Sequence, residues 1–532
     1  MPLTKLQFQP GINRESTSYS NEGGWYDMDK VRFRMGYPEK IGGWTKLGLK
    51  SFLGSCRALH PWRTIALNNY LGVGTSDKYY IEEGQGYYDI TPIRETTSAG
   101  DVTFAASDGS STITVTDTNH GAVIGDFVTF SGAVSLGGLV TADVLNQEYK
   151  INSIVDDNNY TITAREVNSV AIITVDGEYT PVAVTANTSD SGNGGSSVVG
   201  AYQINTGLDT SVFGNGWGAG TWSRGAWNSA AVIDTLTDTL RLWSHDNFGE
   251  DLIINVYNGG IYYWDASVVS PLTSRAVPLS SLAGASNTPT VAAKVIVSDV
   301  DRHVIAFGAN SLGSATQDPL LIRFSDQENA ADWTPSTTNT AGDLLIGSGS
   351  RIVTALETRQ QILVFTDVSL HVMQYLGPPF TFGINMISEN VTIASPNSAI
   401  AIEDNVFWMG SNEFYTYGGA VQKLPCTVRD YVFSDFNQNQ SEKVFAASNT
   451  SFSEVWWYYP SADSANVDRY VVYNYQQNIW YYGTLTRSAW IDRGLEQNPI
   501  AAGLDGYLYT HENGFDDGSQ NPAAAISAYI ES

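Results

Sequence analysis

The chain has 532 residues and a formal net charge of −27, with only 16% charged and 12% aromatic residues. This length predicts more than one compact unit, because domains commonly hold roughly 100 to 150 residues. The composition excludes a disordered chain, a coiled coil and collagen, and the acidic balance argues against a general polyanion binder, which needs clustered Lys and Arg.

The N-terminal region, residues 1–94, is the basic part of the chain. It holds 12 of the 28 Lys and Arg residues against 9 acids, whereas residues 95–220 hold 2 bases against 14 acids. No secretory signal opens the chain, and no run approaches the roughly 20 apolar residues of a membrane span. We therefore expect synthesis in a cytoplasm and no membrane-spanning segment.

Arg32 and Arg34 stand two apart in the run DKVRFRMGYPEK. In a strand they would share one face, and an Arg pair suits bidentate contact with carboxylates. We predict that this pair contacts a partner ring, with a solvated strand face as the alternative.

Residues 98–190 form a block of short strands rich in Val, Ile and Thr. In runs such as SSTITVTDTNHG and NNYTITA, the side chains would alternate between the two faces of a strand. Asn158 and Asn159 suit a tight turn. A charge-poor linker closes the block near residue 200. We predict an inserted small β-domain, a barrel or a sandwich, over residues 95–199.

A Gly-rich segment, FGNGWGAGTWSRGAWNS, follows at residues 213–229. It predicts no phosphate cradle, because no GK[ST] follows and no strand-to-helix switch is visible. Trp217, Trp222 and Trp227 recur every 5 residues, which suits neither a helix face nor a strand face. We predict a loop that packs its indoles onto a neighbour, such as another subunit.

Hairpin-like units recur over residues 200–532. They begin at residues 252, 304, 362, 405, 455 and 499, and residues 70–92 show the same pattern. Propeller blades run about 40 to 50 residues, so the spacing predicts an all-β fold with a β-propeller of six or seven blades. Because closure removes exposed sheet edges, early and late strands are expected to pair, so residues 1–94 would contribute to the ring. The final ISAYI predicts a strand that either pairs inside the ring or marks an early end of the chain.

No residue pattern predicts a catalytic site, a cofactor or a metal ion. The six histidines lie outside metal-ligand spacing, and GxSxG is absent. Cys56 lies beside Arg57 and near His60, as in an activated thiolate, but two buried thiols, Cys56 and Cys426, are the simpler interpretation.

Several acidic pairs also suggest chemistry but have simpler explanations. Glu82 and Glu83, like three other adjacent pairs, fall in polar turns, where such carboxylates are usually solvated. The other pairs are Asp156 with Asp157, Glu403 with Asp404, and Asp516 with Asp517. Asp27 with Asp29, and Asp299 with Asp301, resemble fragments of a calcium loop without its third acid and its glycine.

Three stretches of the chain resemble structural proteins of short-tailed bacteriophages. They are residues 2–44, residues 322–352 and residues 362–419, and the phrase SDQENAADWTP is the most specific part. The family is the tail nozzle, also called tail hub, tail tubular protein B or packaged-DNA stabilisation protein. The resemblance covers roughly residues 1–94 and 200–515.

This resemblance implies a structural protein of the virion tail rather than an enzyme. It implies a β-propeller subunit without a cofactor, as a homohexamer beneath the portal and adaptor rings and in contact with tail fibres. Double-stranded DNA would pass through a central channel without tight binding, which an acidic wall favours. The alternatives are a peripheral tail protein that binds host receptors or glycans and, less favoured, a glycan hydrolase.

Overall fold

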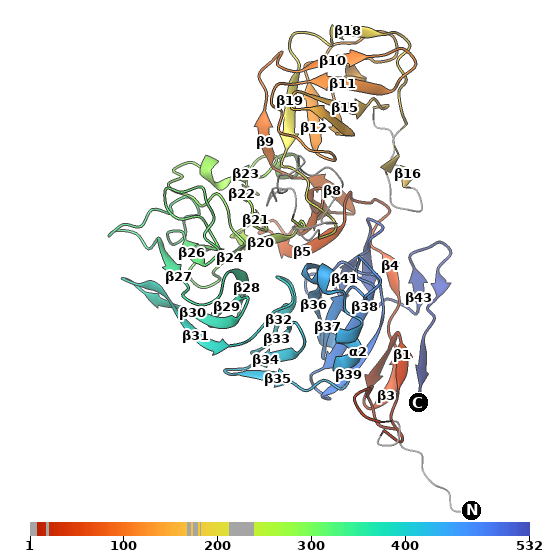
Figure 1. The fold of residues 1–532 in the computed structure, drawn as a ribbon, viewed down its shortest axis with the longest axis vertical. Helices are drawn as coiled ribbons and strands as arrows, with labels where there is room; N and C mark the ends of the chain where they lie inside the picture. Colours follow the sequence, from red (N-terminus) through yellow and green to blue (C-terminus); the bar gives the residue numbers. More distant parts are fainter. Residues whose placement is uncertain (1–7, 18–20, 168–171, 174–178, 181, 212–238) are drawn as a thin grey trace, which may run out of the picture.

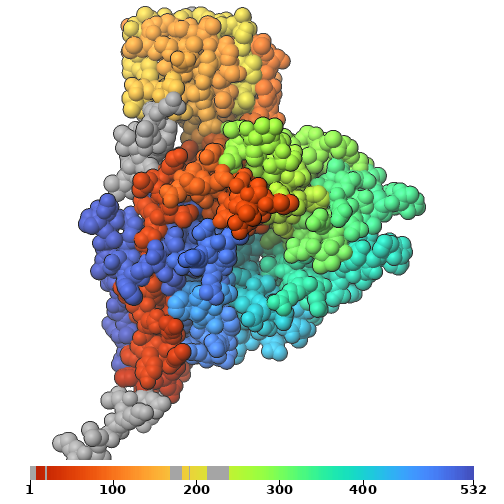
Figure 2. Space-filling model, turned by 180° about the vertical axis from the view of Figure 1, so that it is seen from behind, coloured from red at the N-terminus to blue at the C-terminus, as the bar shows by residue number. Residues whose placement is uncertain are grey.

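The computed structural model describes residues 8–17, 21–167, 172–173, 179–180, 182–211 and 239–532. Figure 1 shows three parts: an inserted domain, a ring of β-sheet blades, and a column of strands from the two ends of the chain. In Figure 2 the inserted domain stands at one end of the molecule and the column of terminal strands reaches the other. The predicted all-β fold is confirmed.

The first four blades are antiparallel sheets whose strands pair in sequence order. Blade 1 contains β5 (Cys56–Arg63), β6 (Asn69–Thr75), β7 (Tyr79–Glu83) and β8 (Gly86–Asp89). Blade 2 contains β20 (Trp243–Phe248), β21 (Asp251–Val256), β22 (Ile261–Trp264) and β23 (Val277–Pro278). Blade 3 contains β24 (Lys294–Val297), β25 (Val304–Phe307), β26 (Leu321–Phe324) and β27 (Gly342–Leu345). Blade 4 contains β28 (Ile352–Glu357), β29 (Ile362–Thr366), β30 (Ser369–Gly377) and β31 (Thr381–Glu389).

The last three blades complete the ring, and blade 7 takes a strand from the N-terminal region. Blade 5 contains β32 (Ala399–Ile402), β33 (Asn405–Met409), β34 (Phe414–Tyr417) and β35 (Val421–Leu424). Blade 6 contains β36 (Phe445–Asn449), β37 (Glu454–Tyr459), β38 (Arg469–Asn474) and β39 (Ile479–Thr484). Blade 7 contains β40 (Ala489–Ile491), β41 (Ile500–Ala502), β42 (Leu508–His511) and β4 (Trp44–Lys46), and its sheet continues into β43 (Asp516–Gly518) and β44 (Ala524–Ala525). Short helices α1 (Ala142–Leu145) and α2 (Arg429–Ser434) lie outside the sheets.

The ring closes by pairing an early strand with a late one. The first strands of successive blades contact one another in order from β5 and β20 around to β40, which contacts β5 again. In blade 7, β4 pairs antiparallel with β42, so that Trp44 lies opposite His511. The described residues therefore form a propeller of seven blades, and the predicted closure is confirmed.

The hairpin units that the sequence pattern located begin at the second strand of each blade. β29, with the sequence ILVFT, and β37, with EVWWYY, are buried along their whole length. Adjoining blades cover both faces of these strands, so their residues form nearly continuous apolar runs. The first strands, such as β20 with WSHDNF, face the axis and mix polar with apolar residues. Their mixed composition explains why the pattern missed them.

The inserted domain consists of two sheets around a core of its own, which confirms the predicted small β-domain. One sheet contains β13 (Glu148–Lys150), β12 (Phe127–Ser131), β19 (Val199–Gln203) and β9 (Ile93–Thr96). The other contains β14 (Ser153–Asp156), β15 (Asn159–Thr163), β11 (Thr112–Thr116), β10 (Thr103–Ala106) and β18 (Asp190–Asn193). A two-stranded pair, β16 (Ile172–Ile173) with β17 (Tyr179–Thr180), accompanies them. The hydroxyls of Tyr160 and Tyr202, 2.8 Å apart, link the two sheets through the core.

Removing the inserted domain is expected to leave the propeller folded. The domain enters and leaves through one neck, where the N–H of Ile204 donates to the carbonyl of Pro92 at 3.0 Å. A turn of about two glycines can span such a gap, so Pro92 can be joined to Ile204 after residues 93–203 are deleted. We expect a cooperative thermal unfolding transition for the shortened protein, measured by circular dichroism.

Among the contacts that this deletion removes, the buried ion pair of Lys78 is compensated within blade 1. The Lys78 ammonium lies 2.5 Å from Glu148 of the inserted domain but also 2.7 Å from Asp89 of blade 1. The deletion therefore leaves Lys78 with a counter-charge. Loss of the transition would contradict the independence of the two units.

The terminal column consists of β1 (Asp27–Asp29), β2 (Val31–Arg34), β3 (Tyr37–Lys40) and β45 (Tyr529–Glu531). β2 pairs with β3, and β45 pairs antiparallel with β1. The final strand therefore pairs outside the seven blades, so the alternative in which it pairs inside the ring was wrong. The reason is that β1 offers an open edge while it lies against β39 of blade 6.

Candidate functional site

Arg32 lies in the interior of the molecule, with 1% of its side chain exposed. Its Nε is 3.1 Å from Glu454, and its other guanidinium nitrogens donate to both carboxylate oxygens of Glu512 at 3.0 and 2.5 Å. Burial raises the pKa of Glu454, and the Arg32 charge opposes that rise. The prediction that Arg32 contacts a partner ring was wrong, because both carboxylates that it binds belong to this chain.

Arg34, two residues further along β2, remains available for a contact. Its side chain is 60% exposed and its nearest carboxylate, that of Glu39, is 3.8 Å away. Both arginines approach the ring of Phe452, at 3.6 Å for Arg32 and 5.8 Å for Arg34. The two side chains therefore do share a side of the strand, but the rest of the fold covers only the first. Contact between Arg34 and a partner stays a prediction.

The other predicted contact lies outside the described residues. Trp217, Trp222 and Trp227 all fall within residues 212–238, which the structure does not describe. Their packing against a neighbouring subunit stays a prediction.

The cysteines are free thiols. Cys56 is fully buried, and burial raises its pKa to about 12, so it is a neutral thiol at pH 7. Burial also raises the pKa of Cys426, which is half-buried. The guanidinium of Arg57 is directed to Asp209 rather than to the sulfur. Thiolate activation at Cys56 is therefore not supported.

Asp27 and Asp29 attach the terminal column to blade 6. Asp27 accepts a hydrogen bond from the Tyr482 hydroxyl at 2.8 Å, and Asp29 accepts from the backbone N–H of Thr484 at 2.7 Å. Within the described residues, no group of three or more His, Cys, Asp or Glu side chains is placed to hold a metal ion. These hydrogen bonds give the two carboxylates a structural role.

The SDQENAADWTP phrase forms the connection between β26 and β27 of blade 3. Trp333 at its centre is buried. Asp326 accepts hydrogen bonds from the backbone N–H and the hydroxyl of Thr340 at 2.8 and 2.7 Å, and Asp332 accepts from the Ser286 hydroxyl at 2.6 Å. The acidic residues of the phrase therefore hold one loop conformation on the propeller.

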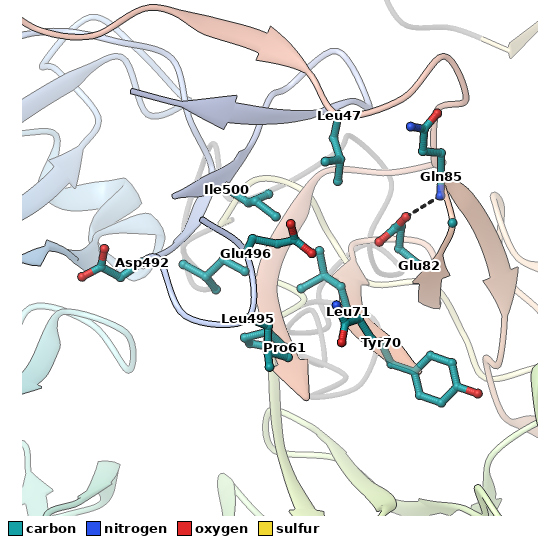
Figure 3. A pocket seen from close by; sticks show the side chains of 13 residues that line it. Leu47, Pro61, Tyr70, Leu71, Glu82, Gln85, Asp492, Leu495, Glu496 and Ile500 are labelled. Carbon is teal, nitrogen blue, oxygen red and sulfur yellow. Dashed lines mark hydrogen bonds between the residues drawn. The ribbon is translucent and has the colours of Figure 1, made fainter. Parts of the chain in front are cut away.

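A pocket of about 270 Å³ lies between blades 1 and 7. Figure 3 shows Tyr70 and Leu71 of β6 beside it, with Glu82 of β7 and Glu496 from the connection between β40 and β41. Burial raises the pKa of the Glu82 carboxyl. The hydrogen bond that the backbone N–H of Gln85 donates to it at 2.7 Å lowers this pKa, whereas the negative charge of Glu496 raises it further. With Asp492, three carboxyl groups line this partly apolar pocket, an arrangement that can bind an amine or supply an acid and a base for a glycosidic bond.

The sequence analysis did not foresee this pairing. It weighed Glu82 with its neighbour Glu83, whereas the fold brings Glu496 from the opposite end of the chain to the same pocket. Two histidines meet in the same way, since the rings of His60 on β5 and His245 on β20 lie 4.8 Å apart. Spacing along the chain carries no signal for either pair.

The tip of the β30–β31 hairpin in blade 4 carries exposed apolar side chains. Leu376 is 61% and Phe380 is 73% exposed, and Leu345 on the adjacent β27 is exposed as well. Large exposed apolar side chains that cluster in this way mark sites of protein contact. Figure 1 shows that this hairpin and the terminal column lie on opposite sides of the ring.

In the part of the chain that the structure covers, no helix is long and apolar enough to cross a membrane. No family model matches the sequence, and no curated protein matches it.

Three solved structures show limited similarity to the chain. Hsv2 from Kluyveromyces marxianus is 7% identical over 49% of this chain and 71% of its own, with a TM-score of 0.29. Hsv2 from Kluyveromyces lactis is 10% identical over 49% of this chain and 69% of its own, with a TM-score of 0.28. The endosialidase of phage phi92 is 11% identical over 95% of this chain and 68% of its own, with a TM-score of 0.21. At these identities and TM-scores, no activity or ligand carries over to this chain.

Proposed function

We propose that this chain is the subunit of a tail nozzle of short-tailed bacteriophages, a hexameric ring below the portal and adaptor that retains packaged DNA and conducts it during ejection. The resemblance of three sequence stretches to that family supports the proposal. The most specific of them is a hydrogen-bonded loop on the propeller, as expected for a structural rather than a catalytic motif.

The structural observation that most directly supports the proposed ring is the exposed apolar tip of blade 4. A tip on one side of the propeller, opposite the terminal column, suits a head-to-tail contact in which each copy presents different surfaces to its two neighbours. Contacts of this kind generate closed rings when the rotation between copies closes. Six copies around a channel for DNA would satisfy this geometry.

The ring can be tested on intact particles. We expect electron cryomicroscopy to show six copies of this protein on the tail axis, and Phe380→Asp to prevent their incorporation, because a charge at the tip opposes apolar contact. Leu49→Asp, at an exposed residue away from the tip, is the matched control and should assemble normally.

A single copy, threefold symmetry or a peripheral position would contradict the ring. Degradation of host polysaccharide by the purified protein would instead favour a glycan hydrolase. In that case, loss of the activity in Glu82→Gln would assign it to the pocket between blades 1 and 7.

DNA is expected to bind the isolated protein weakly. With a net charge of −27, the chain as a whole repels phosphates, so a DNA channel would let the duplex slide. At about 0.15 M salt, we expect a dissociation constant no tighter than roughly 10⁻⁴ M for a duplex, measured by fluorescence anisotropy. Submicromolar binding would reveal a basic track, and residues 1–94 would be the first place to seek it.

A further inference from the structure

A cavity of about 260 Å³ lies on the axis of the propeller, lined by the first strands of six blades and the segment before β32. We call it the axial cavity. Its lining includes two positively charged side chains, Arg57 and Lys294, and the neutral His245, but no Asp or Glu. This is the reverse of the charge balance of the whole chain, which carries −27. The sign of the local charge therefore suits an anionic ligand.

Lys294 on β24 supplies the central positive charge. Its ammonium donates one hydrogen bond, to the Thr354 hydroxyl at 3.1 Å, and among the described residues no carboxylate lies within ion-pair distance of it. An ammonium has three donors, so Lys294 can still bind a ligand. Burial lowers its pKa to about 8, and the negative charge of Asp246 opposes this. An unpaired cation inside a fold is costly, and a bound anion would compensate it.

Arg57 on β5 adds a second positively charged side chain to the lining of the same cavity. One of its terminal nitrogens donates to the backbone carbonyl of Asp209 at 2.9 Å and to its carboxylate at 2.5 Å. Its Nε is buried and has no hydrogen-bond partner in the described part of the chain. His245 is neutral, because burial holds its pKa well below the usual value, and its Nδ1 is 2.9 Å from the Tyr79 hydroxyl.

Three aromatic side chains also belong to the wall. Trp243, Phe445 and Trp490 line the axial cavity. The indole N–H of Trp243 already donates to the Thr75 carbonyl at 2.7 Å, and that of Trp490 donates to the Ser448 carbonyl at 2.9 Å. With their polar atoms satisfied, these indoles offer apolar ring surface to a ligand. Close approach of Trp243 depends on Gly74, since a Cβ there would lie 2.7 Å from the indole.

We propose that the axial cavity binds a small organic anion. Its phosphate or carboxylate group contacts Lys294 and Arg57, and its apolar body lies against Trp243 and Trp490. This site is independent of the tail function proposed above, because it lies within a single subunit.

Isothermal titration calorimetry of the full chain with phenyl phosphate, benzoate and inorganic phosphate tests the site. We expect phenyl phosphate or benzoate to bind at least tenfold more tightly than inorganic phosphate, because only these two carry an apolar body. Whichever of phenyl phosphate and benzoate binds more tightly identifies the preferred head group, phosphate or carboxylate. Lys294→Met should weaken its binding at least tenfold, whereas Lys423→Met, at a lysine that is 67% exposed, should leave it unchanged.

Thermal unfolding without ligand separates ligand binding from a structural role of Lys294. Methionine matches the length of the lysine stem and removes the half-buried, unpaired charge, so Lys294→Met should unfold at a higher temperature than the wild type. Trp490→Leu should weaken the binding of phenyl phosphate or benzoate but not the binding of inorganic phosphate. Three results would overturn the proposal. They are a lower unfolding temperature for Lys294→Met than for the wild type, equal affinity of the wild type and Lys294→Met for the ligand, and no binding of any of the three anions.

Discussion

Replacing Arg32 with alanine is expected to lower the free energy of unfolding by about 3–5 kcal/mol, because it leaves buried carboxylates without their cation. Glu454 is fully buried and Glu512 is mostly buried. Glu454 would keep only neutral donors, the Tyr481 hydroxyl at 2.5 Å and the Trp456 indole at 2.9 Å. Urea unfolding followed by tryptophan fluorescence measures the loss.

Arg34→Ala is the matched control for this variant. It removes the same charge from the same strand, but Arg34 is exposed and its distance to Glu39 is 3.8 Å. Exposed pairs of this kind contribute about 0–1 kcal/mol, so the unfolding midpoint should barely move. Equal losses in the two variants would contradict a buried ion network at Arg32.

The loss in Arg32→Ala is also expected to depend on pH. The pKa of Glu454 is raised by burial, and removing the Arg32 charge raises it further. A carboxyl whose pKa is higher in the folded state destabilises the fold at high pH, and this penalty shrinks as pH falls below the folded-state pKa and is absent below the unfolded-state pKa. The deficit relative to wild type should therefore be larger at about pH 8 than at about pH 5, which approaches the unfolded pKa of about 4.3.

Replacing Trp44 with alanine is expected to cost about 3–5 kcal/mol, the usual range for a buried tryptophan. Trp44 is buried on the closing strand β4, donates to Asp517 at 2.7 Å, and stacks on His511 with ring centroids 5.5 Å apart. The loss should appear in thermal unfolding and as faster proteolysis near β4, because the closing strand would detach more often.

Leu49→Ala provides the control for the closing strand. Leu49 lies just beyond β4 and is 92% exposed, so its truncation should change stability by no more than about 0.5 kcal/mol. Unchanged stability and proteolysis in Trp44→Ala would show that β4 contributes little to holding the ring closed.

The sequence pattern located a hairpin in each of the seven blades, beginning at the second strand, and missed the first strands for a physical reason. Second strands such as β29 have both faces covered, so burial alone makes them apolar and visible. First strands such as β36, with FAASN, alternate between an adjoining blade and the axis. Their polarity depends on what lies along the axis, which no local pattern specifies.

The burial of Arg32 is a second property that the local sequence pattern could not predict. Strand alternation correctly placed Arg32 and Arg34 on one side of β2, but it could not show which of them the fold would cover. The covering residues, Glu454 and Glu512, lie more than 400 positions away in the chain. A buried ion pair and an exposed contact residue are therefore indistinguishable in the sequence.

The sequence by itself determined the properties that depend on near neighbours: strand-forming runs, the turns between them, the blade spacing and the separate character of the inserted domain. Only the tertiary structure decided the number of blades, the partner of β4, the burial of Arg32 and the presence of both Arg57 and Lys294 in the lining of the axial cavity. The physical reason is that closing a ring brings together residues from opposite ends of the chain, and their contacts depend on the geometry of all seven blades at once.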